Sequence, residues 1–227
     1  MNPVYEMSPE EIATHCPFTL AQYLANLGDE DTSRILWTPR PGTATEADFV
    51  AANHKLVELI DGTFVHKTVG SPESQLAMLI GFYPGTWSRA TGAGLVAGVT
   101  CPFWLAPGLI RLPDASFTAW KSLPDPEAHL WDYAKFPPDL AVEVLSLSDR
   151  PNAFARKIRD YLTYGTKCVW VADPRATTVV VYTSPGEATT LTRNDTLDGG
   201  DILPGFSLPL AELFDDPQLN PRRPHGA

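Results

Sequence analysis

The sequence PPDLAVEVLSLSDRPNAFARKIRDYLTYGTKCVWVADP, residues 137–174, decides the fold because it has the pattern of a strand, a helix and a second strand. Only Glu143 interrupts the apolar run 140–145, and such a run is typical of a strand that is buried on both faces. A carboxylate in that strand must be paired, bound to a metal ion or protonated, since an unpaired buried charge costs much free energy. Glu143 is therefore the first candidate functional residue.

The segment after this strand is expected to form a helix that packs back on it. Ser148 or Asp149 is suited to the N-cap, and Pro151 suits the first turn. Lys157 lies at the edge of the apolar stripe of this helix, on the side that would face Glu143. The stripe consists of Phe154, Ile158, Tyr161 and Leu162. The helix also carries three charged residues that are expected to point elsewhere, namely Arg156, Arg159 and Asp160.

A second carboxylate occurs upstream in residues 109–119, LIRLPDASFTA, which are predicted to form another strand. Asp114 follows Pro113 there and has apolar neighbours. Two carboxylates on neighbouring strands can bind a hard divalent cation through oxygen. A lysine beside them can orient an attacking water or stabilise developing negative charge. Asp114, Glu143 and Lys157 thus form one candidate catalytic set.

The composition limits the class of protein. The 227 residues suit one large domain or one domain with appendages, and 44% hydrophobic residues suffice for a core. A net charge of −10 argues against a general nucleic-acid coat protein, because binding to a phosphate backbone requires cations. We identify no signal peptide and no apolar membrane span. Cys16, Cys101 and Cys168 lie far apart without a CxxC pair, which favours free thiols in a reducing cytoplasm.

The chain before residue 109 supplies a third acidic candidate. Residues 56–60 and 63–67 form a predicted hairpin around Asp61-Gly62, and Glu58 lies in its first strand. A helix is expected to begin at Ser71 and to be interrupted or ended at Pro84-Gly85, because proline cannot donate the helical hydrogen bond.

The segments on either side of the strand–helix–strand unit are expected to complete a mixed α/β domain. Residues 121–137 are rich in Pro and Asp and read as a long surface loop, which is a candidate rim of an active site. Residues 178–183 and 189–192 are predicted to form an antiparallel meander after 169–172. Residues 208–214 are expected to be helical in part.

Taken in order, these motifs resemble the Uma-two family of restriction endonucleases, a branch of the PD-(D/E)xK nuclease superfamily. The resemblance covers roughly residues 5–214, with an apparent insertion before Lys55. Each motif is short, and their order and spacing carry the match. The matching positions are 57–62, 112–114, 139–146, Lys157, Tyr161, 169–174, 203–206 and 213–214.

The resemblance implies a restriction-endonuclease-like fold, in which helices flank a central mixed β-sheet. It also implies a cleft for phosphodiester hydrolysis with Mg²⁺ or Mn²⁺. Asp114 matches the Asp of the family motif, Glu143 its second acidic residue, and Glu58 the acidic residue that precedes the Asp strand. Leu145 stands where the parent pattern has lysine, and Lys157 matches the lysine that this family supplies from the following helix. All four are expected to be catalytic, with the three carboxylates as metal ligands.

The expected function is that of a metal-dependent endonuclease acting on nucleic acid, DNA by expectation, as a cytoplasmic homodimer. Residues 1–54 would form an N-terminal helical segment with a loop insertion, 55–214 the nuclease domain and 215–227 a flexible tail. The family often has a histidine in the helix after the first hairpin, and residues 71–75 contain none.

Other interpretations of the same residues are open at the level of sequence. Glu58 could be a solvated strand residue, Asp114 could start a turn, and Lys157 could extend its ammonium group to solvent. A structural ion pair between Glu143 and Lys157 would explain both residues without catalysis. The fold could then serve as a non-catalytic homo-oligomeric binding module. A glycosidase with two carboxylates is a third alternative, although Lys157 would have no evident task in it.

Overall fold

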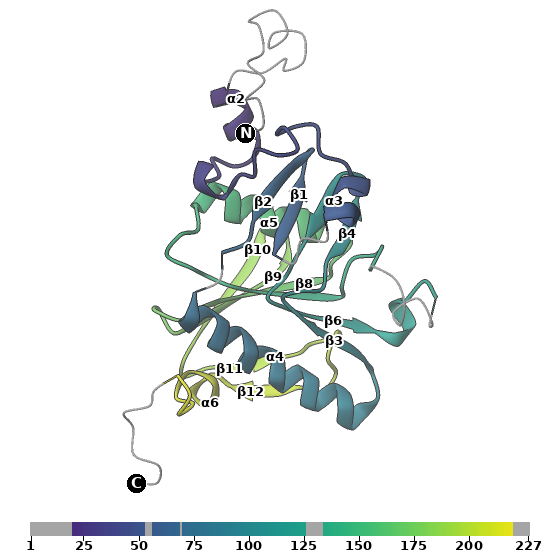
Figure 1. Ribbon diagram of the computed structural model, residues 1–227. Helices are drawn as coiled ribbons and strands as arrows, with labels where there is room; N and C mark the ends of the chain where they lie inside the picture. Colours follow the sequence, from purple (N-terminus) through teal and green to yellow (C-terminus); the bar gives the residue numbers. More distant parts are fainter. Residues whose placement is uncertain (1–19, 53–55, 69, 126–133, 220–227) are drawn as a thin grey trace, which may run out of the picture.

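Three β-sheets and the helices that cover them make up the described part of the computed structural model, which comprises residues 20–52, 56–68, 70–125 and 134–219 (Figure 1). The larger sheet has six strands in the order β10-β9-β8-β7-β6-β3, and the smaller has four in the order β2-β1-β5-β4. A third sheet pairs β11 with β12. The strands of the large sheet are β3 (Gly94–Gly98), β6 (Ala115–Ala119), β7 (Leu140–Val144), β8 (Cys168–Asp173), β9 (Thr178–Ser184) and β10 (Glu187–Thr192).

The remaining elements surround this large sheet. Among the described residues no helix combines the length and the apolar character that crossing a membrane requires. The small sheets consist of β1 (Val57–Ile60), β2 (Thr63–His66), β4 (Phe103–Ala106), β5 (Leu109–Arg111), β11 (Thr196–Asp198) and β12 (Ser207–Pro209). The helices are α2 (Leu20–Asn26), α3 (Glu46–Ala52), α4 (Ser71–Thr91), α5 (Pro151–Thr163) and α6 (Leu210–Phe214), with 3-10 turns at Thr32–Arg34 and Trp120–Ser122.

Strand β7 lies inside the large sheet with all five residues buried, as its apolar sequence predicts. It pairs in parallel with β8, and helix α5 makes the crossover between them. The other pairs of this sheet are antiparallel, including the predicted β8–β9–β10 meander. The sheet is therefore mixed, and among its described strands β7 and β8 form the one parallel pair.

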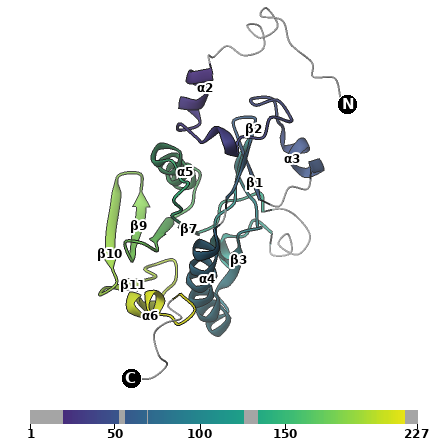
Figure 2. The same cartoon turned by 60° about the vertical axis from the view of Figure 1, so that its left-hand side comes forward.

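The alternation of side chains along β7 assigns its residues to two different layers. Leu140, Val142 and Val144 face a large apolar cluster that includes residues of α4, α6, β11 and β12. Ala141 faces the opposite layer, where Ile158 and Tyr161 of α5 pack. Figures 1 and 2 show α5 beside the β1–β2 hairpin and α4 beside α6 and β11. Because side chains alternate along a strand, Glu143 lies on the α5 side.

Helix α4 differs from its prediction, because it runs without interruption through Pro84 and ends only at Thr91. Gly92 terminates it with a left-handed backbone (φ 66°), and its N–H donates to the Ser88 carbonyl oxygen at 2.8 Å. Proline removes a single helical hydrogen bond. Pro84 and Ile80 are both buried, and Ile80 packs in the apolar cluster of the large sheet, so packing holds the helix together across the proline.

Residues 109–119 also differ from their prediction, because they form two strands instead of one. β5 belongs to the small sheet and β6 to the large sheet. Pro113 lies at the break, where it cannot donate a ladder hydrogen bond. The chain passes from one sheet to the other at residues 112–114, so Asp114 lies at the junction of the two sheets.

The start of α5 needs a smaller correction. Its N-cap is Arg150, and no side chain caps the helix, whereas Ser148 or Asp149 was the predicted cap. Asp149 instead accepts the backbone N–H of Ser146 at 2.8 Å and so closes the turn before the helix. Pro151 occupies the first turn, as predicted.

Candidate active site

Six buried charged side chains meet at the junction of the sheets, five of them from four elements and one linker, and the sixth, Lys67, directly after β2. Glu58 comes from β1, Arg111 from β5, Asp114 from the link between β5 and β6, Glu143 from β7 and Lys157 from α5. None of them is more than 9% exposed. The structure thus brings together all four residues that the sequence named as catalytic. The solvent-exposed alternatives for Glu58 and Lys157 are thereby excluded.

Glu143 is held from the α5 side by two residues of one helical face. The Lys157 Nζ atom lies 2.9 Å from the Glu143 carboxylate, and the Tyr161 hydroxyl donates to Glu143 Oε1 at 2.9 Å. Residues four apart on a helix share a face, so a single helix presents both donors. The predicted approach of Lys157 to Glu143 is correct, and Tyr161, which the sequence placed in the apolar stripe, also has a polar contact.

Asp114 is fixed by the backbone of β7. Its own N–H donates to the Val142 carbonyl oxygen at 2.9 Å, and its Oδ2 accepts the Val144 N–H at 2.7 Å. These two hydrogen bonds flank Glu143 in the sequence. The separation of the Asp114 and Glu143 carboxylates is therefore set by strand geometry and not by flexible side chains.

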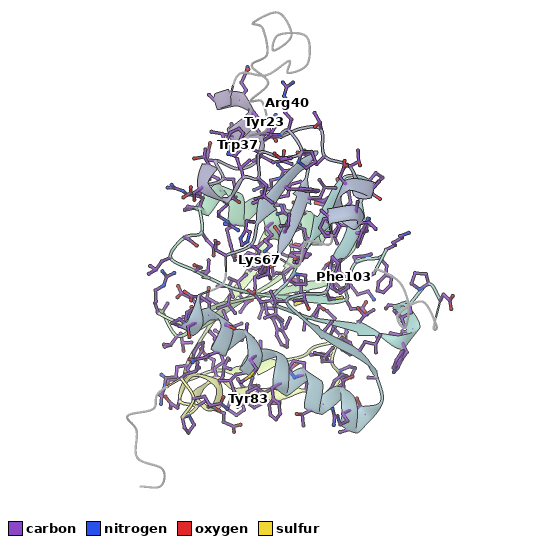
Figure 3. All side chains as sticks on the ribbon, viewed as in Figure 1. Tyr23, Trp37, Arg40, Lys67, Tyr83 and Phe103 are labelled. Carbon is purple, nitrogen blue, oxygen red and sulfur yellow. The ribbon has the colours of Figure 1, made fainter. Side chains whose placement is uncertain are left out.

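Lys67, at the end of the hairpin, lies between these two carboxylates, and the sequence analysis did not identify it. Its Nζ is 2.9 Å from Asp114 Oδ1, 3.4 Å from Glu143 Oε2 and 2.5 Å from the Leu112 carbonyl oxygen. Figure 3 shows Lys67 near the middle of the molecule, between the hairpin and the large sheet. The ammonium group is buried and is held by three oxygen atoms.

Glu58 shares Lys157 with Glu143 and also pairs with Arg111. Its Oε2 accepts the Arg111 guanidinium at 2.7 Å, and its Oε1 accepts the Leu112 N–H at 3.1 Å and lies 3.1 Å from Lys157 Nζ. Arg111 in turn donates to Asp160 from Nε at 3.1 Å. Asp160 was expected to point away from the centre, and this is wrong, because the Arg111 side chain extends to meet it.

The surroundings push the pKa values of the two glutamates in opposite directions. Burial alone would raise the pKa of Glu58, but the positive charges of Lys157 and Arg111 hold it well below its usual value. The pKa of Glu143 is raised by its burial and by the nearby charges of Asp114 and Glu58, in spite of its lysine partners. Burial would lower the pKa of Lys157, but Glu143 and Glu58 raise it, so this lysine stays cationic.

The donor atoms fit a hard divalent cation in part. Leu112 O, Asp114 Oδ1 and Glu143 Oε2 surround the Lys67 ammonium, and oxygen is the ligand that Mg²⁺ and Mn²⁺ prefer. In the part of the chain that the structure describes, no three His, Cys, Asp or Glu side chains are grouped as a metal site requires. The Glu58 oxygens contact Arg111, the Leu112 N–H and Lys157, and not the Lys67 ammonium group on which the other oxygens converge. Asp114 and Glu143, with one backbone carbonyl, are thus the residues that fit a metal.

A narrow pocket leads to this centre and offers about 30 Å³ to water, space for one or two ordered molecules. Besides Arg111, two further arginines, Arg34 and Arg150, line it together with Thr68 and Ser146, and Glu73 contributes from the first turn of α4. Arg34 pairs with Glu30 at 3.1 Å and Arg150 with Asp31 at 3.3 Å, so the pocket carries positive charges that carboxylates balance. The described part of 121–137, the predicted rim, does not line the pocket.

The residues that sequence reasoning missed differ in how much signal they left. Arg111 interrupts the apolar run LIRL as Glu143 interrupts its own strand, so the same argument about a buried charge could have found it. Lys67 directly follows β2, where a lysine is normally solvated. Only the approach of the hairpin to the large sheet buries it, and no local pattern reports that approach.

Comparison with known proteins identifies a family whose profile matches the region of the chain that contains this centre. Residues 47–211 match the sequence profile of the Uma2 family, which is described as “Putative restriction endonuclease”. A crystal structure from Anabaena variabilis, described as that of “a putative nuclease”, is 19% identical to the chain. It matches with a TM-score of 0.66 over 75% of this chain and 97% of its own. The comparison with curated proteins finds no match. The predicted restriction-endonuclease-like fold, a mixed sheet flanked by helices, is confirmed.

Proposed function

The chain belongs to the Uma2 family, and from this premise we propose that it is an endonuclease that hydrolyses phosphodiester bonds of DNA with Mg²⁺ or Mn²⁺. The proposed catalytic residues are Glu58, Asp114, Glu143 and Lys157. One observation carries the proposal. Lys157 is held between Glu143 at 2.9 Å and Glu58 at 3.1 Å, and the backbone of β7, the strand of Glu143, positions Asp114 beside them.

Asp114 and Glu143 would hold the cation, and Glu58 would act beside them through Lys157. A divalent cation, when bound, neutralises phosphate charge and lowers the pKa of water. Lys157 remains protonated because its two glutamates raise its pKa, so it serves as a cation and not as a general base. Its proposed role is to stabilise the negative charge that develops on the phosphate.

The surrounding residues keep this arrangement in place. Arg111 and the Leu112 N–H hold Glu58, and the Tyr161 hydroxyl holds Glu143. These contacts fix the orientation of both carboxylates beside Lys157. Positioning by second contacts of this kind is typical of catalytic centres. Arg34 and Arg150 at the pocket would attract the phosphate backbone of the substrate.

The test is metal-dependent cleavage of supercoiled plasmid DNA by the wild type and by Asp114→Asn. The variant keeps an oxygen for the Val144 N–H but loses the charge, so we expect cleavage in Mn²⁺ to fall by about 100-fold or more. Asp198→Asn is the matched control, because Asp198 lies on β11, outside the pocket residues, and should cleave like the wild type. An RNA substrate in parallel tests the choice of DNA.

A non-catalytic binding module is the second candidate, and one observation favours it. Lys67, Lys157 and Arg111 already pair with the three carboxylates, which is what a purely structural ion network requires. The two candidates differ in their response to metal. If the wild type is neither stabilised by Mn²⁺ nor able to cut DNA or RNA, the nuclease proposal fails and the binding module stands.

A further inference from the structure

The position of the Lys67 ammonium group suggests what happens when a cation binds. We propose that Lys67 holds the cation position between Asp114 and Glu143 in the metal-free protein, and that a divalent cation binds there by displacing it. This inference rests on the proposed function, because it concerns the same site. Its basis is that Leu112 O, Asp114 Oδ1 and Glu143 Oε2, all oxygen atoms, converge on Lys67 Nζ.

The charge balance of the centre supports an exchange rather than an addition. The network contains four carboxylates, from Glu58, Asp114, Glu143 and Asp160, and three cations, from Lys67, Arg111 and Lys157. Arg156 lies 3.8 Å from Asp160 and pairs with Asp61 at 2.7 Å, so that this outer pair adds no net charge to the count. Adding a divalent cation to this set would leave a buried excess of positive charge, which is costly. If Lys67 leaves, four negative charges face the two remaining cations and one divalent ion, and the centre is neutral.

The available space leads to the same conclusion. The pocket offers about 30 Å³ to water, so it cannot hold a hydrated cation beside the lysine. A cation in contact with Asp114 Oδ1 would lie at about 2.0–2.6 Å from it. Lys67 Nζ already lies 2.9 Å from that atom, and the two cations cannot share the position.

Of the two lysines in the centre, Lys67 is the one that can move. Lys157 projects from the middle of α5 and contacts both Glu58 and Glu143. Lys67 follows the last residue of β2, and its backbone N–H is held by the Leu56 carbonyl oxygen at 2.8 Å. The Lys67 side chain can therefore change its conformation while its backbone stays in place. Glu73 lines the same pocket and offers the displaced ammonium group a carboxylate.

The consequence is that Lys67 sets the metal affinity of the centre. A cation can bind only if it breaks the contacts of Lys67 with the oxygen atoms. By reciprocity, the lysine weakens binding of the metal ion by the same free energy by which the metal ion weakens the contacts of the lysine. A monovalent ion would replace one positive charge by another without gain, whereas a divalent ion gains one charge in the exchange. Lys67 would therefore favour divalent over monovalent cations.

The first experiment compares Mn²⁺ affinity, measured by electron paramagnetic resonance of free Mn²⁺, in wild type and Lys67→Met. Methionine keeps part of the side-chain stem and removes the competing charge, so we expect binding about tenfold tighter or more in the variant. Lys167→Met is the matched control. Its ammonium pairs with Asp139, outside the pocket, and its Mn²⁺ affinity should equal that of the wild type.

The second experiment uses the unmodified chain and does not depend on whether Lys67→Met folds. Brief acetylation with acetic anhydride and mass spectrometry would report the exposure of each lysine, with and without Mn²⁺. We expect Mn²⁺ to raise the labelling of Lys67 at least fivefold, while Lys157, which keeps both glutamates, stays protected. Lys67 that stays protected at saturating Mn²⁺ would overturn the displacement.

The outcomes separate this inference from the proposed function. If wild type and Lys67→Met bind Mn²⁺ equally and the wild type cuts DNA, the displacement is wrong and the nuclease proposal stands. Weaker binding by the variant also overturns it, because Lys67 would then assist the metal. If neither protein binds Mn²⁺ and the wild type does not cut, both proposals fall.

Discussion

The two faces of β7 are built from alternate residues of one strand, yet they differ in chemical character. On the α4 face, Leu140, Val142 and Val144 join a cluster of apolar side chains that includes Trp170. On the α5 face, Glu143 joins a network of buried ions. The apolar face gains free energy by removing surface from water, whereas the ionic face pays desolvation that its ion pairs only offset.

This difference shows why the site can exist in so small a domain. Buried ion networks are poor sources of stability. The packing of α5, the helix that presents Lys157, would not by itself offset the desolvation cost of the network. The layer of α4, α6 and the β11–β12 pair packs against the far side of the same strand. We infer that the apolar face stabilises the fold and the ionic face carries the chemistry. The predictions below test that division.

The largest effect is expected on the apolar face, from Trp170→Ala. Trp170 is 2% exposed and packs on Phe206 with ring centroids 5.7 Å apart. Its removal leaves a cavity, and the free energy of unfolding in urea should fall by about 3–5 kcal/mol. The Mn²⁺ affinity of the folded variant should be unchanged. Lost metal binding in a folded Trp170→Ala protein would show that the two faces are not independent.

On the ionic face, Lys157→Met should lower the free energy of unfolding by about 3 kcal/mol, because it leaves two buried glutamates short of a partner. Arg111 and Lys67 still contact Glu58 and Glu143, which keeps the loss at the lower end of the usual range. Cleavage of plasmid DNA should be lost as well. The measurements are urea denaturation and a nicking assay.

Lys167→Met makes the same chemical change at an exposed ion pair and serves as the control. Lys167 is 54% exposed, and Asp139 keeps the Ala119 N–H and the Ser122 hydroxyl as donors. The loss should be under about 1 kcal/mol. If both Lys→Met changes lower the free energy of unfolding equally, the burial of Lys157 does not increase its contribution to stability.

The smallest effect on the ionic face concerns pH and distinguishes the two glutamates. The lowered pKa of Glu58 means that its ionised form adds stability above the usual value of 4.5, and this is lost as pH falls below it. Glu143 has a raised pKa, so its ionisation costs stability as pH rises above 4.5. The advantage of wild type over Glu58→Gln should shrink by about 1–2 kcal/mol on acidification, and its advantage over Glu143→Gln should grow.

Urea denaturation at pH 7, 5 and 3 measures both differences. Lys157 stays cationic throughout this range, because Glu143 and Glu58 raise its pKa, so its charge does not contribute to the trend. Parallel pH profiles for the two variants would contradict the opposite shifts.

The sequence by itself determined the parts of this protein that depend on neighbouring residues. The apolar run around Glu143 predicted a buried central strand, and the spacing of Lys157 predicted its approach to that glutamate. The Asp61-Gly62 turn predicted the hairpin that carries Glu58. These features follow from side-chain period and turn chemistry, which act within a few residues and can be read directly from the sequence.

The tertiary structure alone decided where the charges found their partners. Lys67 is 45 residues from Leu112 and 76 from Glu143 along the chain, and Arg111 is 49 residues from Asp160. Such contacts depend on how two sheets meet, and the break at Pro113 that separates the sheets was predicted as continuous strand. Local periodicity contains no information on the packing of one sheet against another. For that physical reason the sequence identified the three glutamate and aspartate carboxylates and Lys157, and only the fold identified Lys67 and Arg111 as further cations that neutralise them.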